Sequence, residues 1–268
     1  MAADGAAGYG PDNAWHKALT RLRLLEQWLD PATFRHLRAR GVGAGWRCLE
    51  VGAGAGSVAH WLCGQVCPGG EVVATDIDPR FLETHSEANL RVLRHDITAD
   101  NLPPAAFDLV HCRLVLAHLP DRRAVLSKLA AALRPGGQLV AEEMDFVSVV
   151  ADAGQPGGRA FNAAVASSND VLRTRGFDPE CGRVLLADLA GAALADIGTE
   201  GHVRLWPGGS PGAMAWRLTF EQLRSDMAAL GLDHATIAAA IEACEDPGFT
   251  FMSQVTITAW GQRPSAHR

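Results

Sequence analysis

The sequence predicts an α/β fold in which a mostly parallel sheet of seven strands carries helices on both faces. Three observations predict it. Apolar runs alternate with helical stretches between residues 46 and 144, a glycine-rich segment joins the first run to a helix, and acidic residues follow the ends of successive runs. The chain has 268 residues, of which 48% are hydrophobic, so it is long enough to bury the core of one large domain.

Five apolar runs are expected to form the parallel strands of this sheet. They are Trp46 to Val51, Glu71 to Asp76, Leu90 to His95, Phe107 to Cys112 and Gln138 to Met144. Two later strands are expected at His202 to Trp206 and at Thr250 to Trp260, where β-branched residues are enriched. Because helical stretches separate the first five runs, the connections are crossovers, which are typical of a parallel sheet.

Apolar residues at helical spacing predict an amphipathic helix near the N-terminus, with one face formed by Trp15, Leu19, Leu22, Leu25 and Leu29. Asp30 as a cap and Pro31 in a first turn indicate a second short helix that runs to Ala39. The clearest helix is Arg122 to Leu133, which ends before the Pro-Gly-Gly of residues 135–137. Further helices are expected at Phe161 to Arg173, Leu185 to Leu194, Ala213 to Leu230 and His234 to Cys244.

Charge and hydropathy exclude several classes of partner. The formal net charge of −6 argues against nucleic acid, because binding a polyanion depends on clustered Lys and Arg. The basic stretch Arg35, Arg38 and Arg40 is interpreted as a solvated helix face, with nucleic-acid contact as the alternative. Met1 to Gly10 lacks the features of an export signal, and no uncharged apolar run reaches about 18 residues. We expect a cytoplasmic protein with a small-molecule substrate and neither nucleic acid nor membrane as partner; a homodimer is compatible with the sequence.

The six cysteines are interpreted as free thiols in a reducing compartment. Cys63 and Cys67, with His60 nearby, can share one helical face, but so few ligands without a second cluster make a poor zinc site. Since a free cysteine behaves as a small hydrophobic residue, we expect packing instead, and we predict no metal.

A glycine-rich loop follows the first apolar run, in the order Glu50, Gly52, Gly54, Gly56 and Ser57. Glycines at the end of a strand allow a ligand to approach the backbone, whereas the simpler interpretation is a tight turn. A dinucleotide fingerprint requires glycine or alanine at the place of Ser57. Glu50 would also repel phosphates, so the loop favours a ligand with an ammonium group.

Acidic residues end the second and third runs as well. Asp76 lies about 20 residues beyond the glycines, where such folds bind a ribose diol, and Ile77 can pack against a base. Asp78 is interpreted as the cap of a helix that begins at Pro79. Asp96 offers a carboxylate for an adenine amino group, with Ile97 beside the ring. The ends of successive parallel strands form the crevice where open α/β sheets hold ligands.

With these motifs the sequence resembles the class I S-adenosylmethionine-dependent methyltransferases. It is most similar to the ubiquinone-biosynthesis type and to related small-molecule methyltransferases of bacterial secondary metabolism. The resemblance covers Trp46 to Met144 through LEVGAGAGS, ATDIDP, RHDI, FDLVHCR and ALRPGGQLVAEE, and the ending AWGQRP is also similar. It implies a Rossmann-like sheet and S-adenosyl-L-methionine as cofactor.

The resemblance also implies site residues. The methionine moiety would be bordered by Glu50, Gly52, Gly54, Gly56, Cys112 and Arg113. Asp76 would hold the ribose, and Asp96 with Ile97 would meet the adenine. We expect a single domain, with an N-terminal helical lid at 1–45, the cofactor-binding core at 46–146, helical cap insertions with the sixth strand at 147–248, and the last strand and tail at 249–268. The cap helices depart from the minimal fold, which has a short hairpin there.

Methyl transfer from a sulfonium requires the acceptor to be held in line and water to be excluded. A hydroxyl acceptor also benefits from a base, for which His118 is the first candidate; its alternative is a helix-end residue bonded to backbone. Glu143 is the second candidate, because one of the acids that end the fifth strand should face the acceptor and neighbours on a strand alternate. His16 is the third, against a surface position.

Four aromatic side chains are candidates for apolar pocket walls, although core packing is the default interpretation of each: Trp15, Trp206, Trp216 and Phe161. We expect O-methylation of a natural-product-like acceptor. C- or N-methylation stays open, as does a methyltransferase-fold cyclase or isomerase that binds the cofactor without transferring methyl, and a non-catalytic regulator. A nicotinamide-dependent oxidoreductase is disfavoured by Ser57, by Glu50 and by the lack of a Tyr-x-x-x-Lys pair, since Tyr9 is the lone tyrosine.

Overall fold

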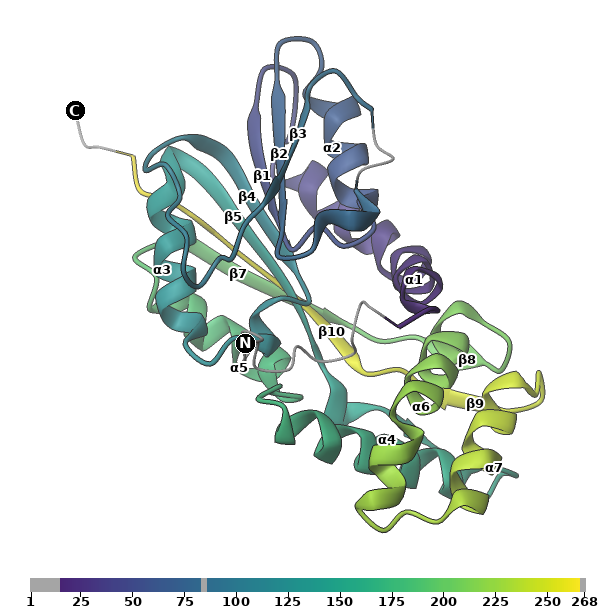
Figure 1. The fold of residues 1–268 in the computed structure, drawn as a ribbon. Coiled ribbons are helices and arrows are strands. Elements are labelled where there is room, and N and C mark those ends of the chain that lie inside the picture. The colour runs from purple at the N-terminus through teal and green to yellow at the C-terminus, as the bar shows by residue number, and fades with distance from the viewer. Residues whose placement is uncertain (1–14, 83–85, 266–268) are drawn as a thin grey trace, which may run out of the picture. The chain divides into compact units, whose positions relative to one another are not determined.

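The computed structural model describes residues 15–82 and 86–265 (Figure 1). Met1 to Gly10, with Tyr9, lies outside the described residues. The chain forms two compact units that are each discontinuous in sequence. The sheet unit comprises Leu29–Glu143, Cys181–Gly201 and the described residues from Thr256 onward. The helical unit comprises the described residues up to Trp28, Met144–Glu180 and His202–Val255.

A seven-stranded sheet has the order β3-β2-β1-β4-β5-β10-β7. Its strands are β1 (Arg47–Val51), β2 (Glu71–Asp76), β3 (Leu90–Arg94), β4 (Phe107–Arg113), β5 (Leu133–Asp145), β7 (Ala195–His202) and β10 (Val255–Gln262). The pairs β1·β2, β2·β3, β1·β4 and β4·β5 are parallel. The predicted α/β fold with a mostly parallel seven-stranded sheet is therefore confirmed.

Helices cover this sheet. They are α1 (Ala18–Ala39), whose second half belongs to the sheet unit, α2 (Ser57–Val66), α3 (Arg122–Ala132) and α5 (Cys181–Ala190), with short 3-10 turns η1 (Pro79–Phe81) and η2 (Leu116–His118). Figure 1 shows α2 beside β1 to β3, and α3 with α5 beside β5 and β7. Leu62, Cys63 and Val66 of α2 pack on Val72 and Ala74 of β2. Burying this face removes apolar area from water, which is the main stabilisation of such a layer.

Cys63 lies in this apolar core, while Cys67 is exposed. No group of three or more His, Cys, Asp or Glu side chains within residues 15–82 and 86–265 is arranged to hold a metal ion. The three arginines of the basic stretch each contact a residue of the sheet unit. Arg35 pairs with Glu200, and the guanidinium groups of Arg38 and Arg40 lie over the rings of Trp61 and Trp260, respectively.

The N-terminal helix is one element and not two, so the expected break at Asp30 is wrong. Pro31 lies inside α1, and the carboxylate of Asp30 is not used as a cap. It accepts hydrogen bonds from Ser57 Oγ and Arg113 Nη1, both at 2.9 Å. Contacts with residues distant in sequence thus override a local stop signal.

The later strands also differ from the prediction. The sixth strand of the large sheet is Ala195–His202, and not His202 to Trp206. It is the edge strand β7, whose residues are exposed or half-buried, so it lacks the apolar run that marks a buried strand. The expected strand Thr250 to Trp260 is divided into β9 (Thr250–Met252) and β10.

The helical unit contains α4 (Gly158–Thr174), α6 (Pro211–Ala229) and α7 (His234–Glu245), which pack on one another, and the 3-10 turn η3 (Phe146–Ser148). A three-stranded antiparallel sheet in this unit joins β6 (Val150–Ala151), β9 and β8 (Leu205–Pro207). Phe161 and Trp216 are buried in an aromatic cluster with Phe220, Phe249 and Phe251. Those two side chains are core residues, which was the default interpretation.

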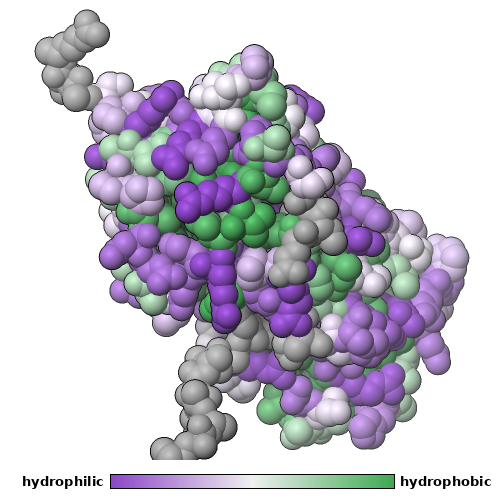
Figure 2. Space-filling view, turned by 45° about the horizontal axis from the view of Figure 1, so that its top comes forward, coloured by the Kyte–Doolittle hydropathy of each residue, from purple (hydrophilic) through white to green (hydrophobic). Residues whose placement is uncertain are grey.

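Trp206 is half-buried and packs edge-on against Trp28, and Trp15 is half-buried beside His16. Asp78 occupies the N-cap position of η1, which begins at Pro79 as expected, but its carboxylate makes no cap hydrogen bond and pairs with Arg80. On the visible face of the sheet unit, hydrophilic residues surround an area of hydrophobic ones (Figure 2).

None of the helices in the described part of the chain combines the length and apolar character needed to cross a membrane.

Candidate cofactor site

Strand register brings the predicted site residues to one edge of the sheet. Val51, which precedes the glycines, pairs with Thr75 of β2 and with Cys112 of β4. Asp76 pairs with Arg94, the last residue of β3. Because these strands are parallel, their carboxyl ends lie side by side, and the loops that follow them share one edge.

The glycine loop between β1 and α2 has a backbone that side chains rarely permit. Gly52, Gly54 and Gly56 have φ of 67°, 57° and 95°, in the left-handed region. Gly52 N and Ala53 N donate to the carbonyl oxygen of Thr75 at 2.8 and 3.0 Å. These bonds hold the loop against the end of β2, and α2 begins directly after Gly56. The loop thus turns its backbone toward the strand ends.

Asp76 ties the second strand to this loop. Its Oδ2 accepts from Gly54 N at 2.9 Å, and its Oδ1 accepts from Asp78 N at 2.9 Å. Burial raises the pKa of the Asp76 carboxyl, and these backbone hydrogen bonds oppose the rise. Each oxygen keeps a second lone pair, so the carboxylate can still accept from a ribose diol.

Asp96 follows β3, on the strand beyond β2. Its Oδ1 accepts from Thr98 Oγ1 at 2.6 Å and from Thr98 N at 2.8 Å, and this bonding lowers the pKa of the carboxyl. Ile97 is buried, while Ile77 after β2 is half-buried. The carboxylate of Asp96 can therefore still accept hydrogen bonds near the carboxyl edge of the sheet, where Asp76 also lies.

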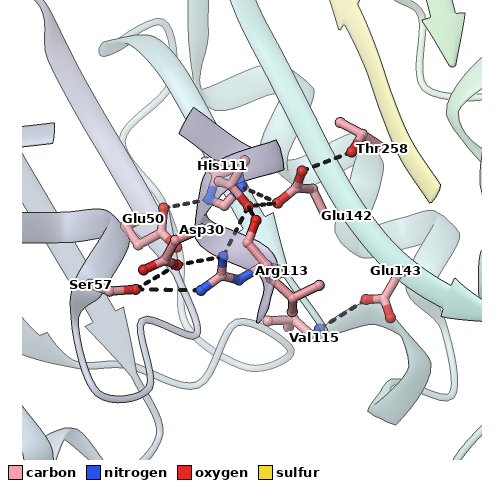
Figure 3. A network of polar contacts seen from close by, with 11 residues as sticks. Asp30, Glu50, Ser57, His111, Arg113, Val115, Glu142, Glu143 and Thr258 are labelled. Atoms are coloured by element: carbon pink, nitrogen blue, oxygen red, sulfur yellow. Dashed lines mark hydrogen bonds and ion pairs between the residues drawn. The ribbon is translucent and has the colours of Figure 1, made fainter. Parts of the chain in front are cut away.

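A buried polar network, shown in Figure 3, lies where β1, β4 and β5 approach their carboxyl ends. His111 of β4 stands between two carboxylates: Nδ1 is 2.6 Å from Glu50 Oε2, and Nε2 is 3.4 Å from Glu142 Oε2. Glu142 also accepts from Thr33 Oγ1 at 2.5 Å and from Thr258 Oγ1 at 2.8 Å. Glu50 thus has a protein partner that its place beside the glycines did not reveal.

These contacts set the charges of the network. Burial alone would lower the pKa of His111, but attraction and hydrogen bonds to Glu50 and Glu142 raise it to about 9. Burial would likewise raise the pKa of Glu142, yet its bonds to His111, the charge of Arg113 and the bond from Thr33 lower it to about 2. His111 is therefore an imidazolium and Glu142 a carboxylate at neutral pH.

Arg113 connects the network to α1 and to the glycine loop (Figure 3). Its Nη1 donates to Asp30 Oδ1 and to Thr33 Oγ1, both at 2.9 Å. Asp30 in turn accepts from Ser57, the first residue of α2. Cys112 is almost fully buried, at 1% exposure, and burial raises the pKa of its thiol, so it packs inside the sheet as a neutral group.

Glu143 points to the opposite side of β5 from Glu142 (Figure 3). Its Oε1 accepts from Val115 N at 2.9 Å and from Leu116 N at 2.6 Å, so it holds the turn that leads into η2. Its side chain is completely buried, and burial raises the pKa of the carboxyl to about 8 in spite of these bonds. At neutral pH it is largely a neutral acid, which suits a structural role better than that of a base.

The other candidate bases lie in different places. His118 is half-buried at the end of η2, in the sheet unit. His16 is exposed and belongs to the helical unit. Sequence reasoning missed His111, because a lone histidine inside the apolar run FDLVHCR gives no signal apart from its being polar in a buried strand.

Gly52→Ala is expected to lower the free energy of unfolding by about 1–3 kcal/mol. The position has φ of +67°, and an added Cβ would overlap with Val115 Cγ2. Urea denaturation measures the loss, and Val115→Ala in the same chain should recover the steric part. Gly64→Ala in α2, where a Cβ would meet nothing within 4 Å, is the control and should be neutral or stabilising. Equal effects of the two alanines would contradict this account of the loop.

Comparisons with known proteins agree with this geometry. Residues 49–139 match a family described as a methyltransferase domain. A ubiquinone biosynthesis O-methyltransferase of Xylella fastidiosa (strain 9a5c) is 32% identical over 154 residues, which are 54% of this chain and 56% of that protein. The chain spans about half the length of the curated relatives it matches.

Solved structures show the same fold. A proposed methyltransferase from Bacillus halodurans C-125 superposes with a TM-score of 0.58 at 15% identity, over 85% of this chain and 97% of that one. Phosphoethanolamine N-methyltransferase 2 of Haemonchus contortus, in complex with phosphomonomethylethanolamine and S-adenosylhomocysteine, gives 0.51 at 15% identity, over 83% and 50%. With its glycine loop and its acids at successive strand ends, the part of the chain that matches this methyltransferase domain has the features of the class I methyltransferases, whose cofactor is S-adenosylmethionine.

Proposed function

We propose that this chain transfers the methyl group of S-adenosylmethionine to an oxygen atom of a small, natural-product-like molecule. One observation carries the proposal: the glycine loop, Asp76 and Asp96 converge at the carboxyl edge of one parallel sheet. Acidic groups suit a ligand that combines a ribose, an adenine and a cationic methionine end. Of these acids, Glu50 beside the glycine loop would repel the pyrophosphate of a nicotinamide dinucleotide.

When bound, the cofactor supplies an activated methyl group on a sulfonium. The chain's task is then to hold an acceptor in line with that methyl group and to keep water out. The residues that border the methionine end are proposed to be Glu50, Gly52, Gly54, Gly56 and Arg113, with Asp76 on the ribose and Asp96 on the adenine. The positive φ values of the loop glycines support this arrangement, because they let the backbone turn at the end of β1 in a conformation that residues with a Cβ rarely adopt.

Transfer to oxygen is supported by the similarity to a ubiquinone biosynthesis O-methyltransferase and by a histidine on η2. His118 would accept the proton of the acceptor hydroxyl as the oxygen forms a bond to the methyl carbon. When bound, the cofactor would supply this methyl group and would retain the electron pair of its carbon–sulfur bond as S-adenosylhomocysteine. His16 and Glu143 stay as weaker candidates for the base, for the reasons of exposure and burial given above.

We further propose that the reaction needs no metal and serves secondary metabolism in the cytoplasm. The proposed partner is a small molecule, with neither nucleic acid nor membrane bound and a homodimer as a compatible assembly. A net charge of −6 supports the absence of a polyanionic partner.

The proposal is tested by calorimetry followed by an activity assay. Purified protein should bind S-adenosylmethionine and S-adenosylhomocysteine but not a nicotinamide dinucleotide. With methyl-labelled cofactor and a panel of phenols, catechols, amines and activated carbon acids, label should pass to a hydroxyl compound as S-adenosylhomocysteine forms. Label on nitrogen or carbon alone would overturn O-methylation, and binding without transfer to any class would overturn the transferase.

His118→Gln is expected to lower kcat on a hydroxyl acceptor by about 100-fold, because a general base contributes typically 10²–10⁴ to the rate. The dissociation constant for S-adenosylhomocysteine should stay unchanged, since glutamine keeps the size of the side chain. His60→Gln, at an exposed position on α2, is the matched control and should have wild-type kcat. A wild-type rate in the His118 variant would remove this residue from the mechanism.

A further inference from the structure

His111 is a buried charged group that the proposed reaction does not use. Its side chain is completely inaccessible, at 0% exposure, and both ring nitrogens face carboxylates. A neutral imidazole has one N–H and can donate to only one of them, whereas an imidazolium interacts favourably with both, by a hydrogen bond to Glu50 and by an ion-pair contact with Glu142. An isolated ion in this position would be costly, and a structural role alone is served as well by apolar residues of the same volume.

We propose that His111 positions the carboxylate of Glu50 for the amino group of the cofactor's methionine moiety by bridging Glu50 to Glu142. The inference rests on the proposed cofactor site and adds a positioning residue to it. Glu50 and His111 are register partners on adjacent strands, and the glycine loop begins two residues after Glu50. A carboxylate fixed at this point lies at the entrance of the loop.

The charges of the network support this role. The groups around the imidazole are Glu50 from β1, Glu142 from β5, and Arg113 on its own strand, which is paired with Asp30 of α1. The Arg113–Asp30 pair is neutral as a whole, whereas two carboxylates around one imidazolium leave one negative charge. A buried excess negative charge is complementary to an ammonium group and would repel a phosphate.

Glu142 is the fixed end of the contact that joins Glu50, His111 and Glu142. Thr33 and Thr258 donate to its two oxygens from α1 and β10, so Glu142 is held from both sides. The short contact of His111 is to Glu50, at 2.6 Å, and the longer one is to Glu142, at 3.4 Å. His111 therefore transfers the fixed position of Glu142 to Glu50.

The test compares two ligands that differ only at the methionine end. S-Adenosylhomocysteine carries the amino-acid group, and 5′-methylthioadenosine has the same adenosine and thioether without it. His111→Gln keeps an amide near the position of Nε2 and loses the donor to Glu50, and it should weaken S-adenosylhomocysteine at least tenfold. Its affinity for 5′-methylthioadenosine should stay within about twofold of wild type, because that ligand lacks the group that Glu50 would bind.

Two variants make the comparison specific. His111→Asn places its amide near Nδ1, so it keeps the donor to Glu50 but loses the contact with Glu142. Its affinity for S-adenosylhomocysteine should therefore lie between those of wild type and His111→Gln. Asp188→Asn disturbs a different buried cluster, in which Asp188 pairs with Arg122 and Arg123, and should leave the ratio of the two affinities unchanged. A His111→Gln variant that weakens both ligands equally, or neither, overturns the inference while the proposed function stands. Wild-type protein that binds neither ligand overturns both.

A measurement on the wild-type protein keeps the inference testable if the variants do not fold. Nitrogen-15 NMR of histidine side chains at pH 8 should show one ring with protons on both nitrogens. That ring should shift when S-adenosylhomocysteine is added, and not when 5′-methylthioadenosine is added. The absence of a doubly protonated ring at pH 8, or an equal shift with both ligands, overturns the bridge.

Discussion

Glu142→Leu is expected to lower the free energy of unfolding by about 3–5 kcal/mol at pH 7. Glu142 is 2% exposed and accepts hydrogen bonds from Thr33 and Thr258 while it faces the imidazolium of His111. Leucine has a similar volume, so the loss does not come from a cavity. It comes from the hydroxyl of Thr258 and the cation of His111, which lose their acceptor, and from Thr33, whose hydroxyl keeps only its longer contact with Leu29 O. Urea denaturation followed by circular dichroism measures the change.

Single hydrogen-bond variants provide the scale for that measurement. Thr258→Val removes one donor to Glu142 and should cost about 1 kcal/mol, because the net value of one hydrogen bond is of that order. Thr33→Val also removes an acceptor of Arg113 Nη1 and should cost more. Glu142→Gln keeps one acceptor, so its loss of unfolding free energy should lie between the losses of the threonine variants and that of the leucine variant. If the free energy of unfolding of Glu142→Leu lies within about 1 kcal/mol of the wild-type value, the network does not stabilise the fold.

Glu143→Gln is expected to stabilise the protein at alkaline pH and to change little at pH 5. Burial raises the pKa of Glu143 from 4.5 to about 8. A carboxyl with a raised folded-state pKa contributes stability that is complete below pH 4.5 and is lost as pH rises through 8. The shift corresponds to about 5 kcal/mol between those limits, at about 1.4 kcal/mol per unit of pKa. Glutamine does not titrate, and its amide oxygen can still accept from Val115 N and Leu116 N.

The measurement is the difference in unfolding free energy between Glu143→Gln and wild type at pH 5, 7 and 9. His111, whose pKa is raised to about 9, also loses its stabilising contribution as pH rises from 6.5 through 9. That loss is common to both proteins and cancels in the difference. The difference should grow in favour of the variant by several kcal/mol from pH 5 to pH 9. A difference independent of pH would show that Glu143 is ionised throughout, and would restore it as a candidate base.

Much of the sheet could be predicted from local pattern. The strands β1, β2 and β4 are buried on both faces and read as nearly continuous apolar runs, and α3 has a cap at Asp121 that accepts from Ala124 N. The edge strand β7 could not be predicted in the same way. Its residues face solvent, so pairing with the sheet and not burial decides its place.

The residues of the candidate site also divide into those predicted from local pattern and those placed by tertiary contacts. The glycines and Asp76 were predictable because turn conformation and position at a strand end are local properties. Asp30 illustrates the reverse, since it reads as a cap with Pro31 after it. In the folded chain its carboxylate binds Ser57 and Arg113, and the helix continues past it.

The sequence by itself determined, to within one residue, where β1 to β5 end and which acids and glycines follow them, because the period of apolar residues and the requirements of a tight turn depend on neighbouring positions. Only the tertiary structure decided that His111 lies between Glu50, 61 residues away, and Glu142. Strand order and register bring these groups into contact. The charges of these groups then depend on burial and on their mutual interaction. Burial and this interaction both arise only when the sheet is assembled.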